Sequence, residues 1–248
     1  MGTDEPGRPF VPGGRRYGNG VPTVQPHIRS FHPRRGRVTA SQAAAIERLW
    51  PVFGFDVGPE LIDPAELFGN DRPVVVEIGF GTGEATAAMA AADPSTNLLA
   101  VDVHTPGFGQ LLAQIDAGGL QHVRVASGDA VELLRDMLPP ASLAGIRIYF
   151  PDPWPKAKHH KRRLVAPGFA AVAVSRLAPG GTLHLATDWP DYADQMRQVL
   201  DAEPTLVKVF DASQPRWQLR PGQRPTTRYE RAGVAKGHPV VDLLYVRS

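Results

Sequence analysis

Residues 74–92 read VVVEIGFGTGEATAAMAAA, and this stretch decides the fold expected for the chain. The apolar run VVVEI predicts a buried strand, because β-branched residues in a short unbroken run are typical of a strand covered on both faces. The alanine-rich run EATAAMAAA predicts a helix. Glycines at 79, 81 and 83 lie between the two, where they allow a tight turn and a close approach of the backbone to a ligand.

Further strands and helices alternate along the chain after this unit. Short, nearly continuous apolar strands that alternate with helices are typical of a parallel sheet covered on both faces. We therefore expect an α/β fold with a seven-stranded, mostly parallel sheet and helices on both faces. Ligands of such sheets bind at the carboxyl ends of the strands. The further strands are expected at 97–103, 122–126, 146–150, 182–186, 206–210 and 242–246, and the further helices at 108–117, 130–138, 167–177 and 191–202.

The chain before the first strand divides into a basic arm and one helix. Residues 1–37 hold seven Arg and two acidic residues among many Pro and Gly, a composition that predicts mostly disorder. This arm is either an inert extension or a segment that orders on RNA. Thr39 and Gln42 form a capping-box pattern that predicts a helix at 40–49, and the Pro and Gly residues at 51–59 predict a loop after it. We expect residues 38–248 to form a single domain.

Basic residues gather in three segments, although the formal net charge is only +2. These segments are the arm at 1–37, a run at 156–163 and a late stretch at 216–236. Three basic segments around a neutral middle fit a face that binds a polyanion. Phosphate contacts of this kind are expected to make binding sensitive to salt.

Several classes of protein are excluded or lack support. The chain has no Cys, which excludes a disulfide framework, thiolate zinc sites and a Cys nucleophile. Its eight His residues show no ligand spacing, so no metal site is expected. Neither a nucleophile elbow nor a phosphate-binding P-loop occurs, so hydrolase and NTPase functions have no support. Without a long apolar run or a signal-peptide pattern, we expect a cytoplasmic protein and no membrane partner.

The glycine turn favours a cofactor without phosphate groups. A dinucleotide fingerprint requires a third Gly at position 84, where this chain has Glu84, and a carboxylate there would face a pyrophosphate. S-adenosylmethionine therefore fits the pattern better than NAD. The alternative is a tight turn between strand and helix that binds nothing.

Three carboxylates lie at or near the ends of the first three regular strands. Glu77, buried beside the turn, needs a cationic or donor partner and could bind the amino group of a methionine moiety. Asp102 could accept two hydrogen bonds from ribose hydroxyls, or it could cap a helix. Asp129 could meet the adenine amino group or serve as the N-cap of the next helix, and the sequence does not separate these roles.

A second informative stretch, residues 150–163, reads FPDPWPKAKHHKRR at the end of the fourth strand. Prolines on both sides of Asp152 stiffen the exit from the strand, and Trp154 follows. Motifs of an acid, a proline and an aromatic residue at this place occur in enzymes that methylate nitrogen atoms on bases. The usual form has two prolines before the aromatic residue, which here comes one place earlier. The alternative is a Pro-rich turn followed by a run of solvated charges.

Four motifs, in the expected order, resemble the tRNA (guanine-N7-)-methyltransferase family, which uses S-adenosylmethionine. They are EIGFGTGE at 77–84, FPDPWPK with KHHKRR at 150–163, ATDW at 186–189 and TTRYE at 226–230. The similarity covers about residues 37–248 and implies a Rossmann-like class I methyltransferase that forms N7-methylguanine in tRNA, at guanine 46 of the variable loop.

The resemblance also implies a set of site residues and places Asp152 in the catalytic position. The chain departs from the family at Asp102, where Glu is usual, at Ala157, where a basic residue is usual, and at His160, where Asn is usual. A monomer or a homodimer is expected. The implied cofactor contacts are Glu77, Gly79, Gly81, Asp102, Asp129 and Asp152; the substrate contacts are Lys156, Asp188, Thr227, Arg228, Tyr229 and Glu230; the RNA contacts are Lys158, His159, His160, Lys161, Arg162 and Arg163.

The chemistry of the implied reaction suits an acid that moves no proton. Guanine N7 carries a lone pair and no proton, so methyl transfer needs no general base, whereas the product base is cationic. Asp152 beside the reacting nitrogen could stabilise that charge as it develops and orient the guanine. Lys156 could bind a phosphate or guanine O6, and Asp188 could accept hydrogen bonds from guanine N1 and N2. Trp154 could stack on a base or pack within the turn.

Two other functions remain alternatives at this point. The first is a different nucleic-acid N-methyltransferase, for example one that acts on an exocyclic amine. The second is a non-catalytic RNA-binding protein on the same fold, which would have lost the cofactor acids that this chain retains.

Overall fold

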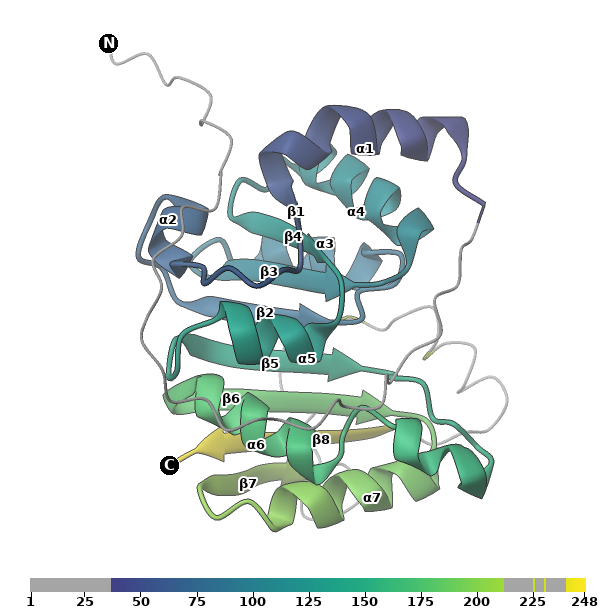
Figure 1. Cartoon of the computed structure of the whole chain (residues 1–248), viewed down its shortest axis with the longest axis vertical. Helices are drawn as coiled ribbons and strands as arrows, with labels where there is room; N and C mark the ends of the chain where they lie inside the picture. Colours follow the sequence, from purple (N-terminus) through teal and green to yellow (C-terminus); the bar gives the residue numbers. More distant parts are fainter. Residues whose placement is uncertain (1–36, 212–224, 226–229, 231–239) are drawn as a thin grey trace.

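The computed structural model describes residues 37–211, 225, 230 and 240–248, and these form an eight-stranded sheet (Figure 1). The strand order is β1-β4-β3-β2-β5-β6-β8-β7. All pairs from β1 to β6 are parallel, and β6–β8 and β8–β7 are antiparallel. The strands are β1 (Gly54–Asp56), β2 (Val74–Ile78), β3 (Asn97–Asp102), β4 (Val123–Ser127), β5 (Leu143–Tyr149), β6 (Leu177–Thr187), β7 (Leu206–Asp211) and β8 (Val241–Arg247).

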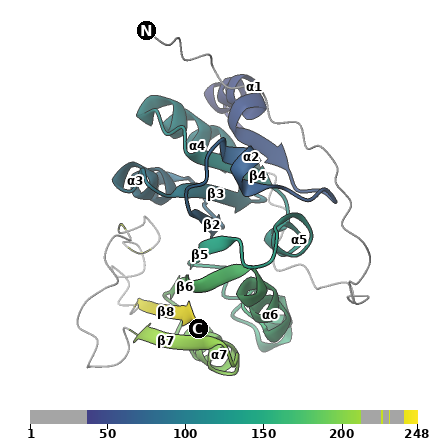
Figure 2. The ribbon, with the colours of Figure 1, turned by 90° about the vertical axis from the view of Figure 1, so that its left-hand side faces the viewer.

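Helices cover both faces of this sheet (Figure 2). Helices α1, α3 and α4 close an apolar core against β2, β3 and β4, and the other helices build a larger core on the opposite face. The expected α/β fold, with a mostly parallel sheet covered on both faces, is confirmed. The helices are α1 (Ala40–Phe53), α2 (Pro64–Phe68), α3 (Glu84–Ala92), α4 (Thr105–Gly118), α5 (Ala130–Glu132) with a π-helical turn (Leu133–Met137), α6 (Pro167–Arg176) and α7 (Pro190–Asp201).

The sheet has eight strands where seven were expected, because residues 54–56 form β1 instead of a loop. These residues pair in parallel with β4, from Gly54 opposite Val125 to Asp56 opposite Ser127. The local sequence predicted a loop, since Pro and Gly residues cluster here. Pairing with a strand far along the chain overrides that signal.

Helix α1 begins as predicted and ends later than predicted. Its capping box is present: Thr39 Oγ1 accepts from the Gln42 amide at 3.3 Å, and Gln42 Oε1 accepts from the Thr39 amide at 2.8 Å. Pro51 was expected to end the helix but lies inside its last turn. Leu49 and Phe53, one turn apart on one face, are both buried, and this burial offsets the hydrogen bond that a proline cannot make.

Strand β6 also runs through a predicted break. Residues 179–181 (PGG) were expected only to end the preceding helix, yet they lie within β6. A register shift between Leu143 and Gly145 of β5 accommodates the irregular stretch, so that Leu143 pairs with Leu177 and Gly145 with Thr182.

Replacing Gly54 by Ala is expected to destabilise the protein by about 1–3 kcal/mol, the usual cost of overpacking. An added Cβ would lie 2.3 Å from the ring of Trp50, which packs edge-on against Phe108 at a centroid distance of 5.4 Å. Gly58→Ala is the matched control, because a Cβ there meets nothing within 4 Å. Urea denaturation gives both free energies of unfolding, and equal values for the two variants would contradict this packing.

Candidate active site

The glycine turn after β2 has the backbone conformation that its sequence predicts. Gly79, Gly81 and Gly83 have φ angles of 80°, 58° and 78°, in the left-handed region that favours glycine. A Cβ at Gly83 would lie 2.7 Å from the Leu111 side chain, whereas a Cβ at Gly79 would meet nothing within 4 Å. Gly83 therefore serves the packing of α3 against α4, and Gly79 faces open space where a ligand can approach.

Asp102, at the end of β3, holds this turn in place. Its Oδ2 accepts a hydrogen bond from the Gly81 amide at 2.9 Å, and its Oδ1 accepts from the amides of Val103 and His104 at 2.6 and 3.0 Å. Burial raises the pKa of the carboxyl, and these three amides oppose that effect. The position of Asp102, about twenty residues after the glycines, predicted a contact with ribose hydroxyls. Sequence reasoning missed the hydrogen bond to Gly81, which makes Asp102 a support for the turn as well.

Glu77, in β2 just before the glycine turn, is a buried acid, and one of its oxygens has no hydrogen-bond partner in the part of the chain that the structure describes. The residue is 3% exposed, and among the described residues its Oε2 and the nearby Thr86 Oγ1 have no hydrogen-bond partner. Burial raises the pKa of Glu77 to about 7, although Thr86 and Arg147, which lies opposite Glu77 on β5, lower it in part. A buried carboxylate oxygen without a hydrogen-bond partner is costly, so this position favours a ligand that brings a donor or a positive charge.

Asp129 is the N-cap of α5, one of the two roles that the sequence left open. Its Oδ1 accepts from the Val131 amide at 2.8 Å, and the residue is buried. A contact with an adenine amino group stays a prediction.

Asp152 lies in a strained loop after β5. Phe150 and Trp154, on either side of it, have φ angles of 53° and 45°. Such values cost about 1–3 kcal/mol each in a residue other than glycine and occur preferentially at functional sites. Asp152 itself is exposed, and among the described residues none donates a hydrogen bond to its carboxylate. The carboxylate is therefore accessible to a substrate.

The basic run after this loop forms a short 3₁₀-helix, Ala157–Arg162. The guanidinium of Arg162 lies over the Trp154 ring at 5.0 Å, and the His159 ring is 5.9 Å from it. Lys156, Lys158 and Lys161 are exposed. Trp154 therefore packs against its own basic run, the second of the two roles considered for it.

Arg163 differs from the other residues of this run. It was implied as an RNA contact, yet its side chain is 1% exposed and its donors face other parts of the protein. The burial of Arg163 could not be predicted from the neighbouring sequence, because it depends on the packing of α7 against this run. Residues 158–162 therefore remain the predicted RNA contacts.

The expected substrate residues are described only in part. Asp188 follows β6 and is half-buried, and Glu230 is buried. Thr227, Arg228 and Tyr229 lie outside the described residues. Because β2, β5 and β6 are parallel neighbours, the glycine turn, Asp152 and Asp188 come at the same edge of the sheet. Asp102, the last residue of β3, and Asp129, which follows β4, lie at this edge as well.

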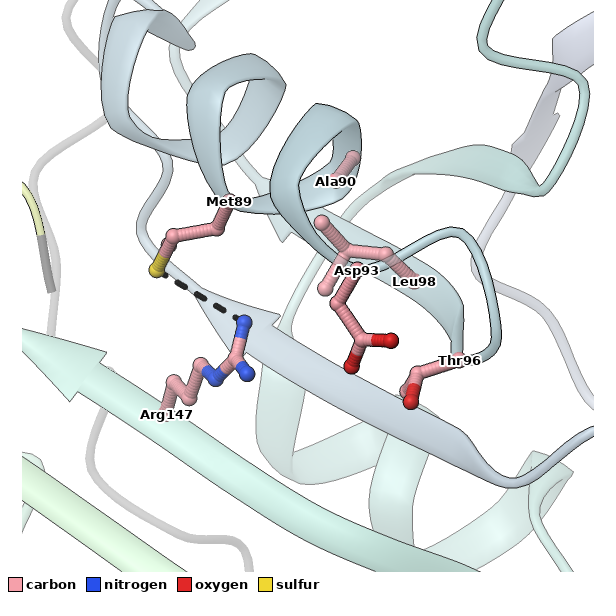
Figure 3. Close-up of a pocket in the computed structure, with 6 residues that line it drawn as sticks. All are labelled: Met89, Ala90, Asp93, Thr96, Leu98 and Arg147. Carbon is pink, nitrogen blue, oxygen red and sulfur yellow. Dashed lines mark hydrogen bonds between the residues drawn. The ribbon is translucent and has the colours of Figure 1, made fainter. Parts of the chain in front are cut away.

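A small pocket outside this site lies beside β5 and the C-terminal end of α3 (Figure 3). Arg147 points into it and donates to the sulfur of Met89 at 3.6 Å, while Asp93 and Thr96 belong to the connection before β3. This connection lies at the amino end of β3, away from the glycine turn, so the pocket is not part of the candidate site. Within the described ranges, no group of three or more His, Cys, Asp or Glu is arranged to hold a metal ion.

The fold and this site define a Rossmann-like class I methyltransferase domain. The crystal structure of the 16S rRNA methyltransferase KamB has a similar fold, with a TM-score of 0.54 and 18% identity over 76% of this chain and 95% of that one. A family model described as "Putative methyltransferase" matches residues 71–243.

Sequence comparison identifies the particular family. A tRNA (guanine-N(7)-)-methyltransferase of Streptomyces avermitilis is 56% identical over 97% of this chain and 82% of its own length. A protein of the same name from Methylococcus capsulatus is 51% identical over 89% of this chain and 94% of its own length. The chain therefore belongs to the tRNA (guanine-N7)-methyltransferase family, as its motifs indicated.

The residues present fit S-adenosylmethionine, the methyl donor expected from the sequence. The unpaired, buried oxygen of Glu77 suits the ammonium group of the methionine part, since the two charges would neutralise each other. Open space at Gly79 leaves room beside the turn. Glu84, in the first turn of α3, disfavours a pyrophosphate at the same place. Gly79 and Gly81 would contact the cofactor through their backbone.

The raised pKa of Glu77 is expected to make the stability of the ligand-free protein depend on pH. The folded value of about 7 exceeds the unfolded value of 4.5, so the folded state binds more protons between these two values. The free energy of unfolding should therefore fall as the pH rises through this window. Urea denaturation at several pH values measures the slope. Glu77→Gln, which cannot titrate, should flatten it, and an identical slope in both proteins would contradict the assignment.

The same substitution is expected to weaken binding of S-adenosylmethionine by about 10- to 100-fold, the range of a charge-assisted hydrogen bond. Glu66→Gln is the control, because Glu66 is exposed on α2, outside the glycine turn, and should leave the Kd within about twofold. Calorimetry measures both. Equal affinities in the two variants would show that Glu77 does not bind the cofactor.

Proposed function

We propose that this protein transfers a methyl group from S-adenosylmethionine to N7 of a guanine in tRNA, at guanine 46 of the variable loop. The observation that carries the proposal is Asp152, an exposed carboxylate in a strained, proline-rich loop beside the strand that leads into the glycine turn. The names of the close relatives support the same reaction.

The cofactor supplies an electrophilic methyl group on a sulfonium sulfur. Because N7 of guanine attacks with a lone pair, no residue has to remove a proton. Asp152 stabilises the positive charge that develops on the purine and fixes its orientation. It acts electrostatically, in an environment whose stiffness requires little reorganisation during the reaction.

The neighbouring residues bind the rest of the substrate. Lys156 lies exposed at the start of the 3₁₀-helix, within the same loop as Asp152, and binds guanine O6 or a phosphate. Asp188, at the end of the next strand, accepts hydrogen bonds from guanine N1 and N2. The run at 158–162 contacts the RNA backbone, and Glu230 with residues 227–229 completes the substrate site.

We place this activity in the cytoplasm, where tRNA is modified, and propose a monomer or a homodimer that needs no metal. None of the helices in the described ranges combines the length and apolar character that a membrane crossing requires. Residues 38–248 are proposed as the catalytic domain. The predictions for the arm at 1–37 fall, except for Arg37, outside the described residues.

Asp152→Asn is expected to slow single-turnover methyl transfer by about 100-fold at saturating cofactor, the size of effect that follows removal of one electrostatic interaction with the transition state. Nucleoside analysis of the modified tRNA should show 7-methylguanosine as the product of the unaltered protein. A different methylated nucleoside would refute the proposed reaction. A near-normal rate in the Asn variant would refute only the role of Asp152.

The double variant Lys158→Ala, Lys161→Ala is expected to weaken tRNA binding and to reduce the slope of log K against log salt by about 2, near one for each phosphate that is no longer neutralised. The control is Arg135→Gln, which removes a cation on the π-helical turn, where it pairs with Asp136. Binding measured between low and moderate salt tests this. An unchanged slope in the double variant would show that the basic run does not bind phosphates.

A further inference from the structure

Arg163 is a buried cation that joins three parts of the active-site edge. Its Nε donates to the carbonyl oxygen of Pro153 at 2.8 Å, and its Nη1 donates to Gln195 Oε1 at 2.8 Å. Its Nη2 donates to Asp191 Oδ2 at 2.5 Å and to His160 Nε2 at 3.1 Å. The guanidinium also lies over the ring of Tyr192 at 4.8 Å.

The ion pair alone does not explain why this arginine is buried. The Asp191 side chain is 62% exposed, so its attraction for the guanidinium is weakened by solvent, whereas the Arg163 side chain is 1% exposed. A guanidinium has five N–H donors in a fixed plane, which lets one side chain bind several acceptors at defined angles. Here these acceptors lie on the Asp152 loop and on helix α7.

The prolines of the Asp152 loop limit the backbone hydrogen bonds that it can make. Prolines at 151, 153 and 155 have no amide hydrogen to donate, and Phe150 and Trp154 have positive φ angles. Strained conformations persist only where the surroundings fix them. The amide of Phe150 donates to the carbonyl of Ala186 at 2.8 Å, which holds the start of the loop, and Arg163 holds the carbonyl next to Asp152.

Helix α7 connects this loop to the second acid of the site. It starts directly after Asp188 and Trp189, and the amides of Tyr192 and Ala193 donate to the Trp189 carbonyl at 3.1 and 2.9 Å. Arg163 binds Asp191 and Gln195 on this helix. The same side chain therefore sets the position of the Asp152 loop relative to the helix that follows Asp188.

We propose that Arg163 is a positioning residue that holds the Asp152 loop against α7 in the geometry needed for methyl transfer. It does not touch the substrate. The inference rests on the proposed function, because it takes Asp152 as the residue that contacts the reacting base. It also makes a claim about the loop that can be tested without any activity.

The test compares Arg163→Lys with Arg176→Lys. Lys keeps the charge, but its single ammonium nitrogen cannot occupy the three positions from which Nε, Nη1 and Nη2 bind Pro153, Gln195 and Asp191. Arg176 is the matched control, because it also donates to backbone carbonyls, those of Leu134 and Arg135, away from the active site. Single-turnover methyl transfer should slow by about 100-fold in Arg163→Lys, as for a small misplacement of a reacting group, and stay within about twofold in Arg176→Lys. The Kd for S-adenosylmethionine should not change in either.

Hydrogen–deuterium exchange of residues 150–163 supplies the readout that needs no activity. Exchange in this segment should rise in Arg163→Lys and stay unchanged in Arg176→Lys. If Arg163→Lys does not fold, Asp191→Asn takes its place. This change removes the negative charge of one exposed partner and leaves the Pro153 bond, so we expect a rate about 3- to 10-fold lower at an unchanged Tm.

The outcomes separate the two hypotheses. If the unaltered protein forms no 7-methylguanosine, the proposed function fails, and the exchange experiment still tests the support of the loop. If the unaltered protein is active, normal rates and normal exchange in Arg163→Lys, or in Asp191→Asn where the former does not fold, overturn the positioning role. If methyl transfer slows equally in Arg163→Lys and Arg176→Lys, the positioning role is overturned as well.

Discussion

Three backbone amides converge on the carboxylate of Asp102, and the geometry of the active-site edge depends on this contact. One of the amides belongs to Gly81 in the turn after β2, and the other two belong to residues that follow β3. The carboxylate thus joins the ends of two central, parallel strands. The glycine turn follows β2, and β5, which leads to Asp152, pairs with β2 on the side opposite β3. A displacement of the turn would therefore move the proposed cofactor site relative to Asp152.

The two halves of the site hold groups that are unfavourable without their ligands. In the cofactor half, one oxygen of the buried Glu77 has no hydrogen-bond partner within the described ranges, and burial raises the pKa of this residue to about 7. In the substrate half, two residues with positive φ hold Asp152 exposed to solvent. Stabilising features surround both halves: an apolar core lies on each face of the sheet, and Arg163 joins the loop to α7. Both features would suit the proposed ligands, a cationic cofactor and a base that becomes cationic.

The sequence predicted those strands and helices that are encoded by a short, continuous pattern of residues. Strand β2 and helix α3 were predicted with their bounds, because an unbroken β-branched run and an alanine-rich run signal them directly. Family membership followed from four ordered motifs. Strand β1, the extension of α1 through Pro51 and the burial of Arg163 were not predicted, since each depends on packing against a segment far along the chain. The need of a buried Glu77 for a donor or cationic partner was predicted, whereas its unpaired oxygen and the hydrogen bond from Gly81 to Asp102 required the fold.

The central claim is that the methyl group goes to N7 of one guanine in the variable loop. Two tRNA transcripts that differ only at nucleotide 46, with guanosine in one and 7-deazaguanosine in the other, test it most directly. The deaza base has a C–H group in place of N7 and keeps its pairing edge and O6. We predict methyl transfer to the guanosine transcript and none to the deaza transcript, with similar binding of both. Equal methylation of the two transcripts would contradict the account.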